Sequence, residues 1–385
     1  MKVGIIDPVG AKAGMDYYDL LLSLGLSENN CEVFLYSNFE NTTASIHYRK
    51  LFFNIDVGKL SAITSNFTGF YKALVDAKKN KVDWILLHVF RAGLFDLFTF
   101  SLVKLMGFKL ITIVHDIESL DTLSIPIIRK TVIGVLPDKR VVHNQFSKDQ
   151  LSKTISASAA NTISVVPHVN FTSLFEKYHS NNSLLEALKN NTLVLNNLDS
   201  RLGDLVKFNN PIILFFGQIK KVKGLDILID ALPLCKTEVH LVIAGKLRNE
   251  NWEKYYKQIV NIKSANKVIS IIRHITDEER DVLFAISTCI VLPYRVIYQS
   301  GVLLMAMSFP LPVIASDLGP NCDIIAHQVN GLLFKSENAA NLAQQIDDLV
   351  SGKVDATHLK NQAFLDIKNR FSYQEIGRQM ATILK

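Results

Sequence analysis

The stretch PIILFFGQIKKVKGLDILIDAL, residues 211–232, contains in order the parts from which most of the chain is built. A run of apolar residues predicts a buried strand that ends at Gly217, a loop with three lysines follows, and a helix begins near Gly224. A strand, a glycine-containing loop and a helix in this order are typical of a parallel sheet that is covered by helices. The stretch therefore predicts one step of an α/β domain.

The same order recurs on both sides of this stretch. Helical stretches such as 17–26, 94–106 and 277–285 alternate with short apolar runs, which predicts two consecutive series of strands and helices. The predicted fold class is therefore α/β, with two Rossmann-like domains facing a central cleft, where ligands bind beyond the carboxyl ends of the strands. The predicted strands are KVGII, CEVFLY, DWILLHV, FKLITIV, KRVVH and ISVV in the first series, and PIILFFG, EVHLVIAG, KVISII, CIVLPY, PVIAS and GLLF in the second.

Composition places the domain boundaries. The first strand series predicts an N-terminal Rossmann-like domain over residues 1–170. Residues 171–210 are polar and rich in asparagine, which predicts an inter-domain region with a helical insert rather than a buried sheet. The second series predicts a C-terminal Rossmann-like domain over residues 211–370.

The overall composition is that of a globular protein, with 48% apolar and 20% charged residues in a chain of 385. The four cysteines have neither metal-ligand nor disulfide spacing, which favours a reducing compartment, and neither a signal peptide nor a membrane span is expected. The net charge of +6 indicates either ordinary solubility or attraction to an anionic surface or substrate. Nucleic acid is not expected as a partner, because no dense basic patch with interleaved aromatics occurs.

Two loops of the first domain carry candidate residues. The loop PVGAKAG, residues 8–14, places Gly10 and Gly14 before a helix, where backbone amides could bind an anion or a sugar hydroxyl; a plain strand-to-helix turn is the alternative. His115 and Asp116 directly follow a buried strand, so His115 could bind a sugar or phosphate oxygen while Asp116 orients it. The alternative for His115 is a loop histidine that bonds to local backbone.

Two loops of the second domain predict a diphosphate site. Lys220, Lys221 and Lys223 lie next to a helix start, although a solvated basic loop would have the same composition. The segment from residue 291 to 321 adds a loop that ends at Ser300 and Gly301, where the first amides of an apolar helix would be free to bind a phosphate. No D-x-D triplet occurs, so fixed cations and helix dipoles are expected to stabilise the leaving group, with no metal site.

These segments together resemble bacterial glycosyltransferases of family 4, which have the GT-B fold and retaining chemistry. The resemblance covers most of the chain and is carried by its second half. RFSYQEIG resembles the start of a closing C-terminal helix, so residues 371–385 are expected to pack back toward the N-terminal domain. The tripeptide QSG at 299–301 indicates a subgroup with a QSG donor loop. The resembling segments are FFGQIKKVKGLDILIDAL, SVVPHVNF, RFSYQEIG and the long stretch from LPYRVIYQSG to NGLLF, residues 292–334.

The resemblance implies roles for individual residues. Lys223 would contact the donor diphosphate with help from Lys220, and His115 would lie near the transferred sugar. Amides near Ser300 and Gly301 would bind the distal phosphate or the sugar. The predicted catalytic residues are thus His115 and Lys223, and the predicted donor-binding residues are Gly217, Lys220, Lys223, Arg273, Ile275, Tyr298, Gln299, Ser300 and Gly301, with the main chain from Arg273 to Ile275 beside the nucleotide base.

Three positions depart from the family pattern. Ile297 and Met305 stand where the family often has two glutamates, the second of which usually holds the ribose hydroxyls. Gln218 stands where an arginine usually follows the family glycine. The departures leave the identity of the donor open, and they motivate the alternative of a non-catalytic homologue.

The predicted function is a cytoplasmic, metal-independent hexosyltransferase of bacterial surface polysaccharide or glycan biosynthesis. No cofactor is expected, because a UDP- or GDP-linked sugar is the substrate, and the acceptor is a glycan or a lipid-linked molecule. A peripheral contact with the inner face of the membrane stays open. The alternatives are a non-catalytic GT-B partner or scaffold of an active transferase, and an epimerase or phosphorylase with this fold. Donor sugar, acceptor, linkage and oligomeric state are not predicted.

Overall fold

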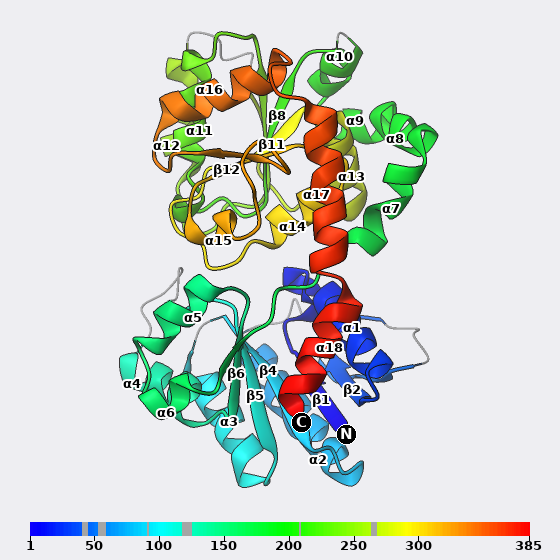
Figure 1. Cartoon of the computed structure of the whole chain (residues 1–385), viewed down its shortest axis with the longest axis vertical. Coiled ribbons are helices and arrows are strands. Elements are labelled where there is room, and N and C mark those ends of the chain that lie inside the picture. The colour runs from blue at the N-terminus through cyan, green and yellow to red at the C-terminus, as the bar shows by residue number, and fades with distance from the viewer. Residues whose placement is uncertain (41–44, 53–58, 91, 118–124, 208, 263–267) are drawn as a thin grey trace. The chain divides into compact units, whose positions relative to one another are not determined.

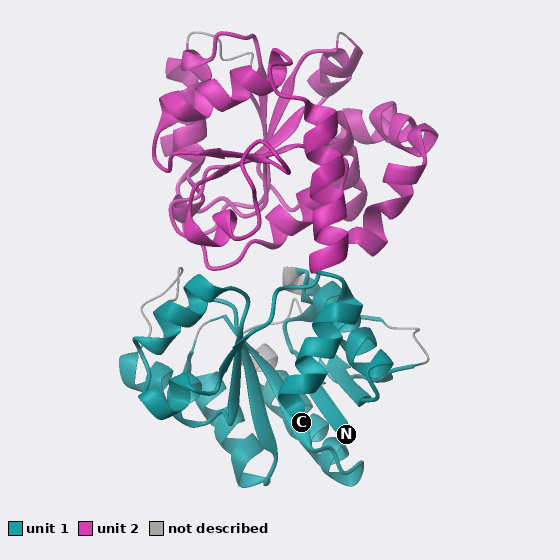
Figure 2. Cartoon of the chain, viewed as in Figure 1, with its two compact units in different colours: residues 1–169, 371–385 teal, residues 170–370 magenta. Residues whose placement is uncertain are grey.

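The chain consists of two compact units (Figure 2). The computed structural model describes all residues except 41–44, 53–58, 91, 118–124, 208 and 263–267. Unit 1 comprises residues 1–169 and 371–385, and unit 2 comprises residues 170–370. Each unit has a parallel sheet covered by helices (Figure 1), which confirms the predicted α/β class with two Rossmann-like domains.

Unit 1 has a seven-stranded sheet in the order β3-β2-β1-β4-β5-β6-β7, and all of its pairings are parallel. The six strands predicted from the sequence are present. The prediction missed β3, because its sequence HYRK is polar and largely exposed and lacks the apolar run that marks a buried strand. The strands are β1 (Lys2–Ile6), β2 (Glu32–Ser37), β3 (His47–Lys50), β4 (Trp84–Val89), β5 (Lys109–Val114), β6 (Lys139–Val142) and β7 (Ile163–Val165), and the helices are η1 (Gly10–Ala13), α1 (Met15–Glu28), α2 (Lys59–Lys79), α3 (Leu94–Leu105), α4 (Pro126–Arg129), η2 (Lys130–Val135), α5 (Gln145–Ser152), α6 (Ala157–Ala160) and α18 (Tyr373–Leu384).

Unit 2 has a six-stranded parallel sheet in the order β10-β9-β8-β11-β12-β13. All six strands were predicted, because strands buried on both faces read as continuous apolar runs. The strands are β8 (Ile212–Phe216), β9 (His240–Ala244), β10 (Val268–Ile271), β11 (Cys289–Leu292), β12 (Val313–Ser316) and β13 (Leu332–Phe334), and the helices after β8 are η3 (Lys221–Lys223), α11 (Leu225–Ala231), η4 (Leu232–Leu234), α12 (Trp252–Asn261), α13 (Asp277–Ile286), α14 (Gly301–Ser308), α15 (Gly319–Cys322), α16 (Ala339–Val350) and α17 (Ala356–Arg370).

The asparagine-rich stretch from residue 171 forms helices that belong to unit 2. The asparagines begin these helices: Asn181 Oδ1 accepts from the amides of Ser183 and Leu184, and Asn191 Oδ1 accepts from the amide of Val194. Phe175 is fully buried, so the stretch contributes to the core of the unit. The four helices are α7 (Thr172–Ser180), α8 (Asn182–Lys189), α9 (Thr192–Leu198) and α10 (Arg201–Lys207).

The last helix of the chain packs on the first one through two glycines in unit 1. A methyl group on Gly25 of α1 would collide with the carbonyl oxygen of Tyr373, and one on Gly377 of α18 would collide with the backbone of Gly25. The hydroxyl of Tyr373 also donates to Glu28, with 3.0 Å between the oxygens. The two helices therefore approach as closely as their backbones allow.

We expect Gly377→Ala to destabilise unit 1 by roughly 1–3 kcal/mol, because the added methyl group forces two backbones apart. The two tryptophans separate the units, since Trp84 lies in β4 and Trp252 in α12. Urea unfolding followed by Trp84 fluorescence in a Trp252→Phe background reports unit 1 alone. The control is Gly93→Ala, where the nearest atom to the new methyl would be 3.6 Å away. Equal midpoints for the two variants would contradict the predicted close packing.

Candidate functional site

Two loops at the carboxyl ends of β8 and β11 are locked together in unit 2. Gly224 has a φ of +67°, and a side chain there would collide with the carbonyl oxygen of Pro293. The Arg295 amide donates to the carbonyl oxygen of Val222 at 2.8 Å. Its guanidinium donates to both carboxylate oxygens of Asp226, at 2.7 and 2.9 Å. The lysine loop and the loop that leads to α14 are therefore one rigid piece.

Lys223 is directed toward the start of α14. Its ammonium nitrogen lies 3.8 Å from the ring centroid of Tyr294, which is a cation–π contact. The hydroxyl oxygen of Tyr294 lies 3.3 Å from Ser300 Oγ, and burial raises the pKa of Tyr294 to about 12, so its phenol stays neutral. The predicted neighbours Lys223 and Ser300 are thus joined through one buried aromatic ring.

The start of α14 presents hydrogen-bond donors that the fold itself does not use. Ser300 Oγ caps the helix by accepting from the Leu303 amide at 3.1 Å, and the helix offers no acceptor for the amides of Gly301 and Val302. A side chain built on Gly301 would meet no atom within 4 Å, so the space in front of it is open. The amide nitrogen Nε2 of Gln299 is buried and has no hydrogen-bond partner among the described residues. Backbone amides at the open start of a helix, with a lysine nearby, suit an anionic ligand.

The other predicted donor residues lie on the same edge of the sheet. The Arg273 guanidinium is bound to Glu279, at 2.7 and 2.9 Å, and the role of the main chain from Arg273 to Ile275 beside a nucleotide base stays a prediction. The hydrogen bonds from Arg273 lower the pKa of Glu279 to about 2. Ile275 and Tyr298 are buried. Gly217 has a φ of +107° and ends β8, and Lys220 precedes η3.

The two positions that depart from the family pattern offer no oxygen ligand. Ile297 is only 5% exposed and belongs to the core, and Met305 lies half-buried on α14. Gln218, the third departure, is exposed after Gly217. A ribose bound here cannot be held by carboxylates at residues 297 and 305.

His115 of unit 1 is 5% exposed, and both of its ring nitrogens face other histidines. Its Nε2 lies 3.0 Å from Nδ1 of His88, and its Nδ1 lies 3.3 Å from Nε2 of His143. Phe90 stacks on the ring, with 4.4 Å between centroids. This environment differs from the alternative of a loop histidine bonded to local backbone, because both ring nitrogens face side chains of other strands. The predicted place of His115 near the transferred sugar stays a prediction. Asp116, its predicted orienting partner, is half-buried.

The sequence analysis missed the other members of this cluster. They are His88, His143, His168 and, on α1, Tyr18 and Asp19. A signal was present, since the predicted strand segments DWILLHV, KRVVH and SVVPH each place a histidine at or just beyond a strand end, as ITIVH does for His115. Neighbouring strands of a parallel sheet bring such residues together.

The loop with Gly10 and Gly14 binds its own polar groups. The carboxylate of Asp7 accepts from the amides of Val9 and Gly10 at 2.8 and 2.9 Å, and Asn38 Oδ1 accepts from the Ala11 amide at 3.0 Å. Because the protein supplies these acceptors, the loop corresponds to the plain strand-to-helix turn rather than to an anion site.

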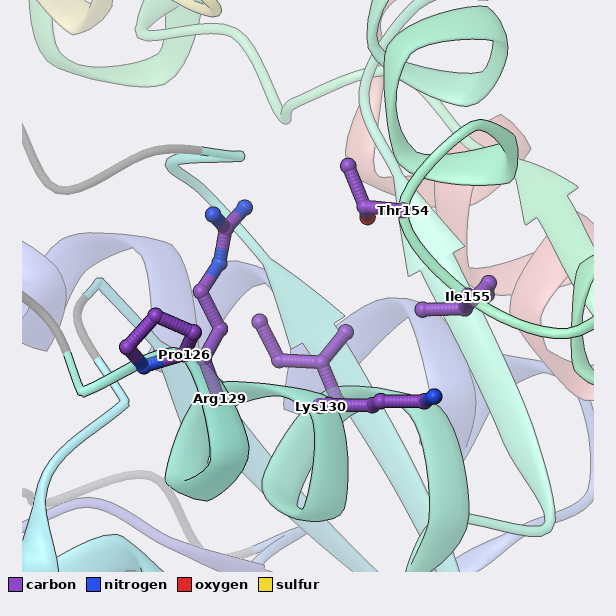
Figure 3. Close-up of a pocket in the computed structure, with 6 residues that line it drawn as sticks. Pro126, Arg129, Lys130, Thr154 and Ile155 are labelled. Carbon is purple, nitrogen blue, oxygen red and sulfur yellow. The ribbon is translucent and has the colours of Figure 1, made fainter.

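A separate cavity of about 250 Å³ lies in unit 1 beside α4 and η2 (Figure 3). Arg129 and Lys130 line it, and their side chains extend in different directions from the helix. A guanidinium nitrogen of Arg129 is buried and finds no hydrogen-bond partner in the part of the chain that the structure describes. The remaining lining residues are Pro126, Ile133, Thr154 and Ile155.

No described helix combines the length and apolarity that crossing a bilayer requires. Within the same part of the chain, no group of His, Cys, Asp and Glu side chains has an arrangement that could hold a metal ion. The four cysteines, all of which lie in the described residues, form no disulfide with one another.

Comparison with protein families and curated proteins gives matches to parts of the chain, and the family match lies in the second unit. Residues 204–366 match the family model "Glycosyl transferases group 1". An uncharacterized glycosyltransferase of Methanocaldococcus jannaschii, MJ1607, is 25% identical over 182 residues, which are 47% of this chain and 46% of that protein. Spore coat protein SA of Bacillus subtilis is 26% identical over 195 residues, 47% of this chain and 50% of that protein. The matches thus span about half the length of these relatives.

Solved structures match the whole chain. HepE from Anabaena, solved with UDP-glucose, has a TM-score of 0.71 at 19% identity and is matched over 100% of this chain and 99% of its own. Sucrose-phosphate synthase from Thermosynechococcus elongatus has a TM-score of 0.74 at 16% identity, with coverage of 100% and 98%. The fold of the chain is therefore GT-B, and residues 204–366 are similar to the glycosyl transferases of group 1.

Proposed function

We propose that the chain is a retaining glycosyltransferase that moves a hexose from a UDP-linked donor, without a bound metal, to a glycan or lipid-linked acceptor in bacterial surface polysaccharide or glycan biosynthesis. The observation that carries the proposal is the set of donors at the start of α14. The Lys223 ammonium lies over the ring of Tyr294, the hydroxyl of Tyr294 lies beside Ser300, and the amides of Gly301 and Val302 follow in the first turn of α14. A diphosphate matches this set in charge and in its number of acceptor oxygens.

The preference for a UDP-linked hexose rests on the comparisons. HepE, which shares the fold, was solved with UDP and with UDP-glucose. Four cysteines that form no disulfide with one another favour a reducing compartment, so we place the protein in the cytoplasm. The cavity beside Arg129 and Lys130 would suit an anionic part of the acceptor.

The proposed chemistry uses fixed charges. The bond between the anomeric carbon and the distal phosphate oxygen breaks, and its electron pair goes to the diphosphate. Lys223 and the α14 amides stabilise that charge because they are already in position and need no reorganisation. The acceptor hydroxyl attacks from the same face, and its proton passes to the departing phosphate, so no protein base is required.

The alternative is a non-catalytic GT-B homologue that supports an active transferase. Ile297 and Met305 favour it, since neither can bind the ribose hydroxyls in the usual way. Calorimetry with UDP, GDP and their sugar conjugates separates the two functions, because a scaffold of this kind would bind none of them.

Lys223→Ala is expected to lower kcat about 10²- to 10³-fold, by analogy with the loss of one oxyanion donor. Donor hydrolysis or transfer is measured as UDP release. The control is Lys221→Ala, which removes an exposed cation two residues away and should change turnover by no more than a few fold. Near-normal turnover in Lys223→Ala, or an equal loss in both variants, would refute the placement of the diphosphate.

Substitutions at two glycines distinguish an effect on UDP binding from an effect on stability. Gly301→Ala is expected to weaken UDP binding about tenfold, which corresponds to about 1.4 kcal/mol, without lowering the melting temperature, because its methyl group enters open space where the phosphate would lie. Gly224→Ala should lower the melting temperature as well, since its methyl group meets the Pro293 carbonyl. Unchanged UDP affinity in Gly301→Ala by calorimetry would place the phosphate elsewhere.

A further inference from the structure

Histidines at the carboxyl ends of four neighbouring strands form a buried cluster in unit 1. The ring of Tyr18 packs against all four, with centroids 4.5–5.9 Å apart. Three of the histidines form a linear chain between the Asp19 carboxyl and the carbonyl oxygen of Val166. The successive contacts are Asp19 Oδ1 to His88 Nε2 at 2.9 Å, His88 Nδ1 to His115 Nε2 at 3.0 Å, His115 Nδ1 to His143 Nε2 at 3.3 Å, and His143 Nδ1 to Val166 O at 3.0 Å.

If all three histidines are neutral, the carbonyl oxygen of Val166 determines which ring nitrogen of each histidine carries the hydrogen. A carbonyl oxygen only accepts, so His143 Nδ1 carries hydrogen, and its Nε2 is then an acceptor, because a neutral imidazole has one N–H. By the same rule His115 donates from Nδ1 and accepts at Nε2, and so does His88. The group that faces His88 Nε2 must therefore donate, which requires a proton on Asp19.

An imidazolium beside an Asp19 carboxylate would satisfy the same four contacts. Burial disfavours both charges: it lowers the pKa of His88 and of His143 to about 4, and it raises the pKa of Asp19 to about 7. The carboxyl of Asp19 also shares a side-chain hydrogen bond with the buried carboxyl of Asp7, and two carboxylates cannot make that contact without a proton. The neutral arrangement is therefore favoured.

We propose that Asp19 is held as the neutral acid, and that Asp19, His88 and His143 are positioning residues that keep His115 neutral in its Nδ1–H tautomer. Because the Val166 carbonyl cannot pass a proton on, the chain is closed at that end. His115 then acts through its fixed position and not as a proton acceptor for the acceptor hydroxyl. The role of His115 in transfer rests on the proposed function, whereas the assignment of the tautomers does not.

Other titratable groups surround the row of histidines, and they contribute to the pH dependence of stability. Asp7 follows β1, and burial raises its pKa to about 7 as well. His168 lies after β7, and burial lowers its pKa to about 3. The hydroxyl of Tyr18 and the carboxyl of Asp16 on α1 and the hydroxyl of Tyr48 on β3 complete the set.

The pH response has a definite sign. Asp19 has a raised pKa in the fold, so its contribution to stability is fully present below the unfolded value near 4 and is lost as the pH rises through about 7. When Asp19 loses its proton, its carboxylate can only accept, so His88 Nε2 must then donate. The three tautomers are then expected to change together, from Nδ1–H to Nε2–H, as the pH rises above about 7.

Nitrogen-15 NMR of the labelled histidine rings tests the proposal on the full chain. At pH 6 we expect His88, His115 and His143 in the Nδ1–H form with no imidazolium, each assigned by its loss in a His→Gln variant. Asp19→Asn presents an amide N–H to His88 Nε2, so it should keep this pattern and abolish the change at higher pH. An imidazolium or an Nε2–H form for any of the three at pH 6 would overturn the proposal.

Stability gives a second readout with a matched pair. Asp19→Leu removes the donor to His88 and should lower the melting temperature of unit 1, while Asp19→Asn should gain stability relative to the wild type between pH 5 and pH 8. A higher melting temperature for Asp19→Leu than for Asp19→Asn would contradict a neutral Asp19. Failure of the wild type to bind or turn over any nucleotide sugar would remove the proposed function and leave the tautomer result as it stands.

Discussion

The parallel direction of all strands in each sheet is the constraint on which both candidate sites depend. Within a sheet the backbone is saturated with hydrogen bonds, so polar groups can gather only where strands end, and parallel strands end along one edge. In unit 2 this brings the loop after β8 against the loop after β11, where Gly224 meets Pro293 and Arg295 binds Asp226. In unit 1 it brings four histidines into contact.

The two sites use this geometry in opposite ways. In unit 2 the polar groups lie at the start of a helix, where a half-buried lysine places its ammonium over an aromatic ring and the first backbone amides have no acceptor within the helix. Such an arrangement favours negative charge. In unit 1 the polar groups contact each other, and both ring nitrogens of His115 lie within hydrogen-bond distance of another histidine. A buried network of such contacts makes the cluster rigid.

The apolar runs predicted the sheets almost completely, because parallel strands are buried on both faces. The polar edge strand β3 has no such run, and it was missed. Lys223 and Gly301 could be predicted because a loop glycine and a helix start are local features of the sequence. The bond between Arg295 and Asp226 and the chain from Asp19 to His143 could not, because their partners lie 69 and 124 positions apart and only strand order brings them together. The sequence singled out His115 as a candidate, but it did not predict the histidines that surround it.

The closed histidine chain bears on how the acceptor loses its proton. If His115 donates to His143 and accepts from His88, neither ring nitrogen is left for an acceptor hydroxyl. A base would then have to be the departing phosphate, whose charge Lys223 and the α14 amides hold in place. On this view the buried proton on Asp19 matters for transfer because it keeps His115 out of the proton chemistry while it fixes the shape of the site.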